Sequence, residues 1–312
     1  MEPLTLSADT AGIARAAAVL RDGGLVAVPT ETVYGLAARA DSDAAVAAIY
    51  RAKGRPDFNP LIVHVTDLAQ GEALARFDSR ATALAAAFWP GALTMVLPRR
   101  AAAGLAAAVT AGLPTVALRC PAHPAMRALL VESGLALAAP SANRSGGVSP
   151  TEAAHVAASL GVNVDLILDG GACATGIEST IVALREDGSW QVLRPGPVTE
   201  AQISAILGAP DAAMTPAGHI EAPGQMASHY APGKPVRLGA IVAAADEFHI
   251  GFGAVAGQTS LSPSGDLAEA AARLYACLHL SADAPQPRVA VAPVPDHGIG
   301  AAINDRLRRA AA

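Results

Sequence analysis

The chain has 312 residues and a formal net charge of −5 at pH 7, and 52% of its residues are hydrophobic. This length fits one large domain or two ordinary ones, and the negative charge excludes a protein-wide field that attracts nucleic acid or anionic membrane. Aromatic residues make up only 4%, which argues against a stacking platform for single-stranded nucleic acid. Any anion site must therefore be local.

The cysteines and the N-terminus indicate the compartment. Cys120, Cys173 and Cys277 are isolated and form no CxxC pair, which is typical of a reduced cytosolic protein without a structural zinc. The segment "MEPLTLSADT" has no basic region, and no apolar run reaches the ~18 residues of a membrane span. We expect a soluble, cytoplasmic protein.

Helical and extended patterns alternate along the first two thirds of the chain. "DTAGIARAAAVLRDGG" and "SDAAVAAIYRAKG" each have a helix start signal, helical apolar spacing and a Gly stop. One strand pattern, "LVAVP", lies between these two helices. Seven more follow the second helix: "PLIVHV", "ALTMVLP", "TVALRCP", "LALAAPS", "VDLILDGG", "STIVAL" and "WQVLRPG". The sequence predicts an α/β fold with a curved, mixed sheet.

The alternation of helix and strand patterns ends after residue 208. Residues 209–235 hold five prolines and no amphipathic run, so they read as a linker. Within it, "GQMASHYAPGKP" carries Met, His and Tyr together, which indicates a segment that docks on the protein. Residues 236–312 again alternate strand and helix patterns. We predict a catalytic domain over 1–208, a docking linker over 209–235 and a small α/β domain over 236–312.

The common signatures of catalysis are mostly absent. The chain lacks GxxxxGK[ST], HExxH, GxSxG and any metal-spaced His/Cys cluster, so no metal-ligating residue is predicted. "GFGAVAG" resembles a dinucleotide fingerprint, but "QTSLSPSG" follows it where a helix is required. We do not predict a cofactor loop there.

A basic cluster precedes one of the strands, in "KGRPDFNPLIVHV". Lys53 supplies a point charge and Arg55 a planar fork, two complementary ways to hold phosphate oxygens, and Asn59 can donate and accept nearby. The alternative is an exposed basic loop, but the cluster adjoins a buried strand in an acidic chain. His64 fits a packed strand residue or a ligand-binding one.

Polar side chains gather at the ends of other strands. "PTETVYGLAARA" is either a hydroxyl-rich turn or a site for a small polar ligand. Thr115 and Arg119 share one face of a strand. A buried Arg119 needs an anionic partner, which can be a structural Asp or a substrate carboxylate.

The segment "APSANRSGGVSPTEAAHV" combines a donor-rich loop with two glycines. Ser149–Glu152 reads as a capping box, although a Gly-rich loop that enters a helix is also a place for phosphate. Ser179, Thr180 and Arg194 lie at further strand boundaries. The pattern contains no acid/base pair or activated nucleophile, so it favours catalysis by positioning and electrostatics.

These motifs together resemble the threonylcarbamoyl-AMP synthases, in the two-domain form with a YrdC-like catalytic domain and a C-terminal extension. The resemblance covers nearly the whole chain in order. It runs through the following motifs: "PTETVYGL", "KGRP", "NPLIVHV", "FWPGALTMVL", "TVALRCPAH", "APSANRSGGVSPT", "GIESTIV", "LRPGPVT", "APGQMASHYAP" and "VPDHGIGAAINDRLRRAA".

The resemblance implies a nucleotidyltransferase that makes L-threonylcarbamoyladenylate from L-threonine, bicarbonate or CO2, and ATP with Mg²⁺, and that releases pyrophosphate. The product would pass to a tRNA threonylcarbamoyl-transferase complex that modifies the adenosine next to the anticodon. The fold would be YrdC-like, with a shortened Rossmann-like domain at the C-terminus.

The resemblance also implies residue roles. Lys53 and Arg55 would be catalytic and would clamp the triphosphate. L-threonine would contact Thr32, His64, Arg119 and Ser179. ATP would contact Arg55, Asn59, Thr115, Ser141, Asn143, Ser149, Arg194 and Tyr230.

Two other hypotheses remain open. One is a carbamoyl-transfer enzyme on the same fold with a different acceptor, although the chain lacks the acylphosphatase and zinc-finger segments that usually accompany it. The other is an RNA-binding module. The charge and the few aromatic residues count against it, so direct tRNA binding is expected to be weak or absent.

Overall fold

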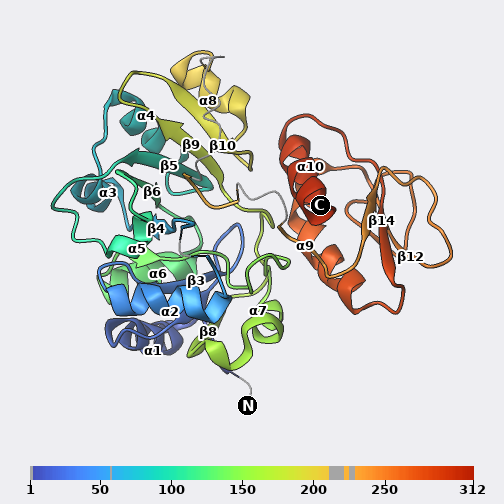
Figure 1. Cartoon of the computed structure of the whole chain (residues 1–312), viewed down its shortest axis with the longest axis horizontal. Coiled ribbons are helices and arrows are strands. Elements are labelled where there is room, and N and C mark those ends of the chain that lie inside the picture. The colour runs from blue at the N-terminus through green and yellow to red at the C-terminus, as the bar shows by residue number, and fades with distance from the viewer. Residues whose placement is uncertain (1–2, 57, 211–220, 225–228) are drawn as a thin grey trace.

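The computed structural model describes residues 3–56, 58–210, 221–224 and 229–312. Figure 1 shows a large N-terminal domain and a smaller C-terminal domain beside it. Much of the predicted linker lies outside the described residues. Within the described part, no helix is long and apolar enough to span a membrane.

The N-terminal domain alternates strands and helices, as the sequence predicted. Its strands are β1 (Leu4–Ser7), β2 (Val26–Val28), β3 (Gly35–Arg39), β4 (Ile62–His64), β5 (Leu93–Pro98), β6 (Thr115–Arg119), β7 (Leu137–Ala138), β8 (Leu166–Asp169), β9 (Thr180–Leu184) and β10 (Trp190–Arg194). Its helices are α1 (Thr10–Arg21), α2 (Asp43–Lys53), α3 (Leu68–Leu74), α4 (Ser79–Phe88), α5 (Ala107–Thr110), α6 (Pro124–Ser133), α7 (Ala153–Leu160) and α8 (Glu200–Leu207), with a 3₁₀ turn η1 (Gly161–Asn163).

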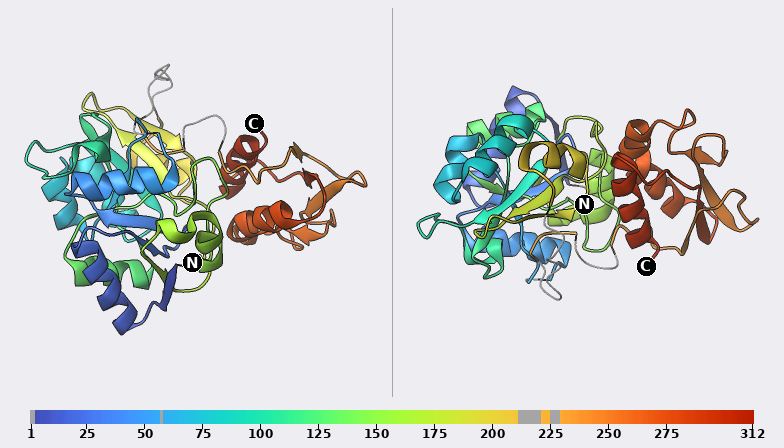
Figure 2. Two further views of the ribbon diagram at one scale, coloured as in Figure 1. Left: turned by 60° about the horizontal axis from the view of Figure 1, so that its bottom comes forward. Right: turned by 90° about the horizontal axis from the view of Figure 1, so that it is seen from above.

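These ten strands form one sheet in the order β1-β8-β2-β3-β7-β4-β6-β5-β9-β10. Parallel pairs such as β4 with β6 alternate with antiparallel pairs such as β5 with β6, so the predicted mixed sheet is confirmed. Helices cover the sheet on its faces (Figures 1 and 2). Strand β3 was not separated from the hydroxyl-rich turn before it in the sequence, because Gly35–Arg39 reads GLAAR, a short stretch without β-branched residues.

Local signals set the ends of the first two predicted helices. Asp9 caps α1 by accepting from Gly12 N at 2.9 Å. Ser42 caps α2, and Gly54 ends it in the left-handed conformation at φ 58°, which glycine adopts without the steric cost of a Cβ.

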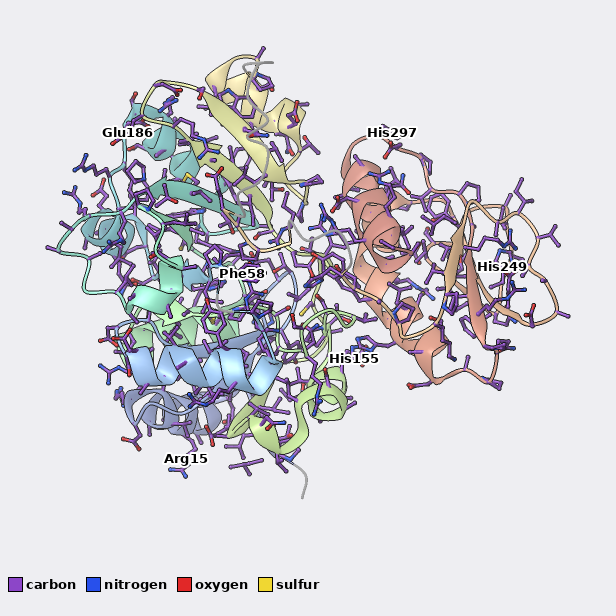
Figure 3. The ribbon with its side chains drawn as sticks, in the orientation of Figure 1. Arg15, Phe58, His155, Glu186, His249 and His297 are labelled. Atoms are coloured by element: carbon purple, nitrogen blue, oxygen red, sulfur yellow. The ribbon has the colours of Figure 1, made fainter. Side chains whose placement is uncertain are left out.

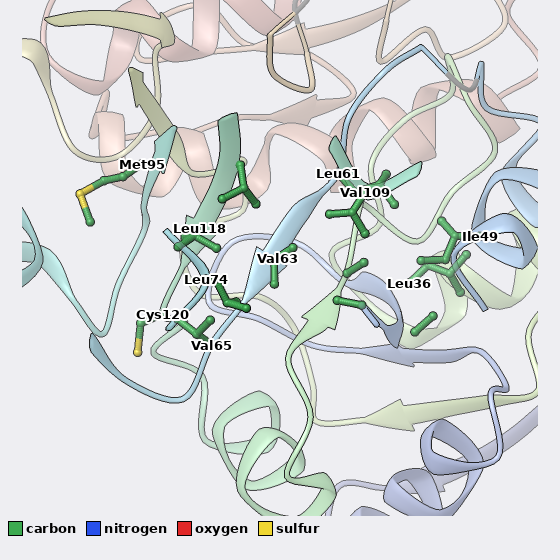
Figure 4. Close-up of a cluster of buried hydrophobic side chains, with 14 of the residues drawn as sticks. Leu36, Ile49, Leu61, Val63, Val65, Leu74, Met95, Val109, Leu118 and Cys120 are labelled. Atoms are coloured by element: carbon green, nitrogen blue, oxygen red, sulfur yellow. The ribbon is translucent and has the colours of Figure 1, made fainter. Parts of the chain in front are cut away.

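The core of this domain is aliphatic. Figure 4 shows part of this buried cluster, to which Leu36, Val63, Met95 and Leu118 of the sheet and Ile49 of α2 belong. Burial of this apolar face fixes which residues of each strand point away from it. The polar residues at the strand ends are therefore held on a rigid frame.

The C-terminal domain is a second, smaller α/β unit, as predicted. It contains β11 (Val236–Leu238), β12 (Glu247–Gly251), β13 (Thr259–Ser260), α9 (Leu267–Asp283), β14 (Arg288–Val291) and α10 (Ile299–Ala310). The strands form an all-parallel sheet in the order β11-β14-β12-β13. Figures 1 and 2 show α9 and α10 between this sheet and the N-terminal domain.

Two local predictions have their outcome here. "GFGAVAG" leaves β12 and leads to the short strand β13 rather than to a helix, which agrees with its rejection as a cofactor loop. The capping box at Ser149–Glu152 was wrong: α7 begins at Ala153, and its N-cap Glu152 makes no side-chain cap bond. The reason is tertiary, because the Ser149 hydroxyl donates instead to Glu178, at 2.6 Å.

Candidate functional site

A polar cavity opens where several strands of the large sheet end, beside the linker. Its walls come from the β2–β3 turn, the residue after α2, the ends of β4 and β6, the loop after β7, the segment before β9, and the linker. The lining residues are Thr30, Thr32, Val33, Gly35, Arg55, Ile62, His64, Arg119, Ala139, Pro140, Ser141, Glu178, Ser179, Arg194, Pro223, Gly224, His229 and Tyr230.

One wall of the cavity is an ordered hydroxyl turn tied to Arg119. The Thr30 hydroxyl donates to Val33 O at 2.7 Å and lies 2.8 Å from the Thr32 hydroxyl. Arg119 donates to Thr32 Oγ1 at 2.9 Å and to Glu31 Oε1 at 2.6 Å. The anionic partner of Arg119 within the chain is thus a glutamate. Burial opposes ionisation of Glu31, but Arg119 holds the pKa of that carboxyl below its usual value.

His64 and Arg119 are register partners at the ends of the parallel strands β4 and β6. Burial, reinforced by the Arg119 charge, lowers the pKa of His64 to about 3, so the imidazole is neutral near pH 7. Its Nδ1 has no hydrogen-bond partner among the described residues. A buried polar atom without a partner that faces a cavity is available to a ligand.

Lys53 is buried and holds the loop after β7 rather than lining the cavity. Its Nζ donates to Ser141 O at 2.6 Å and also to Asn143 O, and its own carbonyl accepts from Ser145 N at 2.8 Å. Burial, with the nearby Arg55 charge, lowers the pKa of Lys53 well below its usual value. Lys53 therefore fixes the position of Ser141, which does line the cavity.

Arg55 lines the cavity two residues beyond the end of α2. Its Nε donates to Asn59 O at 3.2 Å and its Nη2 to Pro60 O at 2.9 Å. These bonds fix the plane of the guanidinium group, and burial lowers the pKa of Arg55 to about 10. The group remains a cation at neutral pH, held in one orientation by its own loop.

Arg194 closes the opposite side through Ser179. Its Nε and Nη2 donate to Ser179 O at 3.1 and 2.9 Å, and Nη2 also reaches Ser179 Oγ at 3.2 Å. Gly224 of the linker passes directly over it: a Cβ there would lie 2.8 Å from Arg194 Cδ. Only glycine permits this close approach. The φ of +86° at position 224 also favours glycine.

The linker supplies His229 and Tyr230, both buried. Tyr230 has a φ of +64°, unusual for a residue with a Cβ, and its ring packs 4.1 Å from that of His229 between ring centroids. The linker backbone is held on both sides, by His229 N donating to Arg309 O at 3.1 Å and Ala231 N donating to Gly146 O at 3.0 Å.

Eight of the thirteen predicted site residues line the cavity: Thr32, Arg55, His64, Arg119, Ser141, Ser179, Arg194 and Tyr230. Four others do not line it: Lys53, at the end of α2, and Asn59, Asn143 and Ser149, in the loops beside the cavity. Thr115 stands apart from the cavity, because it begins β6 and Arg119 ends it, about 13 Å along the strand.

Sequence reasoning missed Glu178, Thr30 and His229 as lining residues. Glu178 was hidden inside "GIESTIVAL", where it reads as the edge of a strand. Its only local signal was an acidic residue in an otherwise apolar stretch, and that signal says nothing about its partners, Ser149, Tyr275 and Arg306. The bonds from Tyr275 and Arg306 to Glu178 are part of the contact between the two domains. The domains meet near His155 in Figure 3.

The fold and the cavity together define a two-domain α/β protein with a site for small anionic or polar ligands at the strand ends. Two family models match the chain: one described as telomere recombination (Sua5, YciO and YrdC) over residues 18–196, and one described as the threonylcarbamoyl-AMP synthase C-terminal domain over residues 198–312.

Individual relatives agree with these matches. The threonylcarbamoyl-AMP synthase of Bacillus subtilis is 41% identical over 98% of this chain and 94% of its own length. That of Pyrococcus abyssi is 44% identical over 71% of this chain and 66% of its own length. The crystal structure of P. abyssi Sua5 complexed with L-threonine superimposes with a TM-score of 0.88 at 34% identity, over 99% of this chain and 97% of that one. The chain belongs to the threonylcarbamoyl-AMP synthase family.

Proposed function

We propose that this protein synthesises L-threonylcarbamoyladenylate from L-threonine, bicarbonate or CO2, and ATP, and releases pyrophosphate. This makes it a nucleotidyltransferase of the N6-threonylcarbamoyladenosine pathway of tRNA modification, with the cytoplasm as its compartment. Family membership over both domains supports the proposal. The observation that carries it is the cavity, where Arg55, Arg119 and Arg194 bring three guanidinium groups to one small polar space.

Threonine would bind on the Thr32 side. The Arg119 guanidinium, held by Thr32 and Glu31, presents a fixed cation to the amino acid carboxylate. His64 Nδ1 and the Ser179 hydroxyl offer further polar contacts to the amine and hydroxyl. The similar P. abyssi Sua5 was solved in complex with L-threonine, which supports threonine as a ligand of this fold.

ATP would bind on the Arg55 and Arg194 side, with Ser141 and Tyr230 at its edges. Four residues would act indirectly, by fixing the loops that carry those groups: Lys53, Asn59, Asn143 and Ser149. For Lys53 this differs from a direct clamp, because both of its bonds go to main-chain carbonyls of one loop. Thr115 does not line the cavity, and its contact with ATP stays a prediction.

The chemistry that this arrangement supports needs no protein nucleophile. The threonine amine would attack CO2 with loss of a proton to solvent, or bicarbonate with loss of water, to form a carbamate. A carbamate oxygen would then attack the α-phosphate in line with the departing pyrophosphate. Neutral His64 can accept a hydrogen bond from the amine at Nδ1, but its low pKa makes it a poor base. The arginines would stabilise charge on the phosphates in a site that the linker shields from water.

Magnesium was expected with ATP, but the described residues offer no group of three His, Cys, Asp or Glu side chains that could hold a metal. Glu178, which lines the cavity, is paired with Arg306, and Glu31, in the turn beside it, is paired with Arg119. The donor set therefore does not form a protein magnesium site, and we assign no step to the ion.

The test is pyrophosphate release from the purified protein with ATP, L-threonine and bicarbonate, each omitted in turn. Release that requires both threonine and bicarbonate is the expected result. ATP turnover indifferent to threonine would contradict the proposal and favour carbamoyl transfer to another acceptor. Filter binding of tRNA at several salt concentrations tests the RNA-binding alternative, since binding through phosphates is tight and salt-sensitive.

A further inference from the structure

A buried polar cluster joins the C-terminal domain to the cavity. It consists of Ser149, Glu178, Tyr275 and Arg306, and we call it the Glu178 cluster. Ser149 donates to Glu178 Oε1 at 2.6 Å, whereas the Tyr275 hydroxyl and Arg306 Nε donate to Oε2 at 2.8 and 3.1 Å. Two of its members come from each domain.

The cluster is fully removed from solvent. Arg306 is 0% exposed and Glu178 6% exposed. Burial alone would raise the pKa of Glu178, but the charges of Arg306 and Arg194 and the two hydroxyl donors lower it to about 2. A buried carboxylate of this kind stays charged only while its cation remains in place.

Glu178 is also the cluster's link to the cavity. It lines the cavity itself, and the next residue, Ser179, carries the carbonyl that Arg194 binds. Arg306 does not line the cavity, but its Nη2 lies 3.4 Å from Glu178 O and its Nη1 donates to Pro195 O. Arg306 therefore fixes the main chain directly after Arg194 and directly before Ser179, the residue that Arg194 binds.

The same two helices also hold the linker and the Ser149 loop. The Arg306 guanidinium carbon lies 5.8 Å from the centre of the Tyr230 ring, and Tyr275 lies 5.5 Å from it between ring centroids. His279 of α9 lies 3.1 Å from Ser149 O. The C-terminal domain thus contacts the linker at Tyr230 and the loop that carries Ser149, in addition to the segments at Glu178 and Pro195.

We propose that the Glu178 cluster positions the nucleotide side of the cavity, so that Arg306 is needed for ATP affinity although it lies outside the cavity. This rests on the proposed function for the identity of the ligand. It assigns the C-terminal domain a role in substrate binding, carried by Arg306 as a positioning residue.

The experiment compares Arg306→Met with Arg308→Met, because Arg308 is exposed on the same helix. For each variant, the KM for ATP and for threonine are measured from pyrophosphate release, with activity normalised to the folded fraction by circular dichroism. We expect the KM for ATP of R306M to rise by about 10- to 100-fold, the range for a displaced binding group, with a small change for threonine. R308M should match the parent.

A double variant separates positioning from stability. Arg306→Met alone leaves Glu178 charged and buried, so its melting temperature will fall. Glu178→Gln combined with Arg306→Met removes both charges and should recover most of the melting temperature, while the KM for ATP stays high. If that KM returns to the parent value together with stability, or never rises in R306M, the cluster serves stability only and the inference is wrong. Tyr275→Phe, which removes one donor, provides a milder variant if R306M does not fold.

Hydrogen exchange tests the positioning role of Arg306 without relying on the proposed reaction. The amides of His229 and Ala231, bonded to Arg309 and Gly146, should exchange faster in R306M than in R308M. An inactive parent protein would overturn the proposed function but not this result. Unchanged exchange with an unchanged KM for ATP would overturn the positioning role in an active enzyme.

Discussion

The Lys53 ammonium group lies 2.6 Å from the carbonyl oxygen of Ser141 and also donates to Asn143 O. One of only two lysines in the chain therefore stabilises a loop 88 residues away in sequence rather than standing free in the cavity. The other side of the same loop is bonded to the linker through Gly146. Lys53 thus connects the end of α2 to the wall that carries Ser141.

This relationship predicts the effect of Lys53→Met. The change removes the Lys53 donor from two main-chain carbonyls. Ser141 O keeps its bond from Asn143 N at 3.0 Å, whereas a buried Asn143 O left without a donor costs about 1–3 kcal/mol. We expect a lower melting temperature, faster hydrogen exchange over residues 141–147 and about 100-fold less pyrophosphate release per folded molecule. Arg51→Met, at an exposed position of the same helix, is the control. Lost activity with unchanged exchange in that loop would show instead that Lys53 acts on the substrate directly.

The sequence predicted the features that depend on local contacts and missed those that depend on contacts between distant residues. Asp9, Ser42 and Gly54 were assigned correctly because a helix cap is a contact within a few residues. The capping box at Ser149 failed because a bond to Glu178, 29 residues away, replaced the local one.

Glu178 shows the same limit more strongly. Its partner Arg306 lies 128 residues further along, in the other domain. Nothing local to "GIEST" distinguishes a partnered carboxylate from an exposed one. Likewise, Lys53 and Arg55 were recognised as a cluster, but the division between a loop-holding lysine and a cavity-lining arginine depends on the distant Ser141 loop.

Arg119→Lys tests the threonine side of the cavity. Arg119 donates to Thr32, Glu31 and Gly91 at once, and a lysine ammonium cannot reproduce this planar set of contacts. We expect the KM for threonine to rise by about 10- to 100-fold with a small change in the KM for ATP. The matched control is Arg127→Lys, because Arg127 contacts Thr66 O outside the cavity. A selective rise in the KM for ATP would move Arg119 to the nucleotide side.

Buried His64 predicts a loss of stability in mild acid. Its pKa is lowered by burial to about 3 in the folded protein, against about 6.5 when unfolded. As the pH falls below 6.5, His64 becomes protonated in the unfolded chain but stays neutral in the folded protein. The free energy of unfolding therefore decreases progressively from pH 6.5 towards pH 3. The loss from this residue is on the order of 3 kcal/mol at pH 4.

The measurement is the melting temperature between pH 8 and pH 4 for the parent and for His64→Gln. The variant should show a flatter decline, whereas His297→Gln, at an exposed position, should follow the parent. Parallel curves for the parent and His64→Gln would mean that His64 does not resist protonation in the folded state.

Gly224→Ala tests whether the linker must lie against Arg194. Alanine at this position meets two obstacles: a φ of +86° and a Cβ 2.8 Å from Arg194 Cδ. Gly233, also in the linker, has a φ of +77° but no atom within 4 Å of its Cβ position. Gly233→Ala therefore carries the backbone strain alone, about 1 kcal/mol or slightly more.

Only Gly224→Ala should displace the linker from the cavity. We expect the KM for ATP to rise at least about tenfold in Gly224→Ala, and the hydrogen exchange of the His229 amide to increase with it. Gly233→Ala should lower the melting temperature slightly and leave both readouts near the parent values. If the two variants behave alike, strain explains the effect, and close contact between Gly224 and Arg194 has no part in ATP binding.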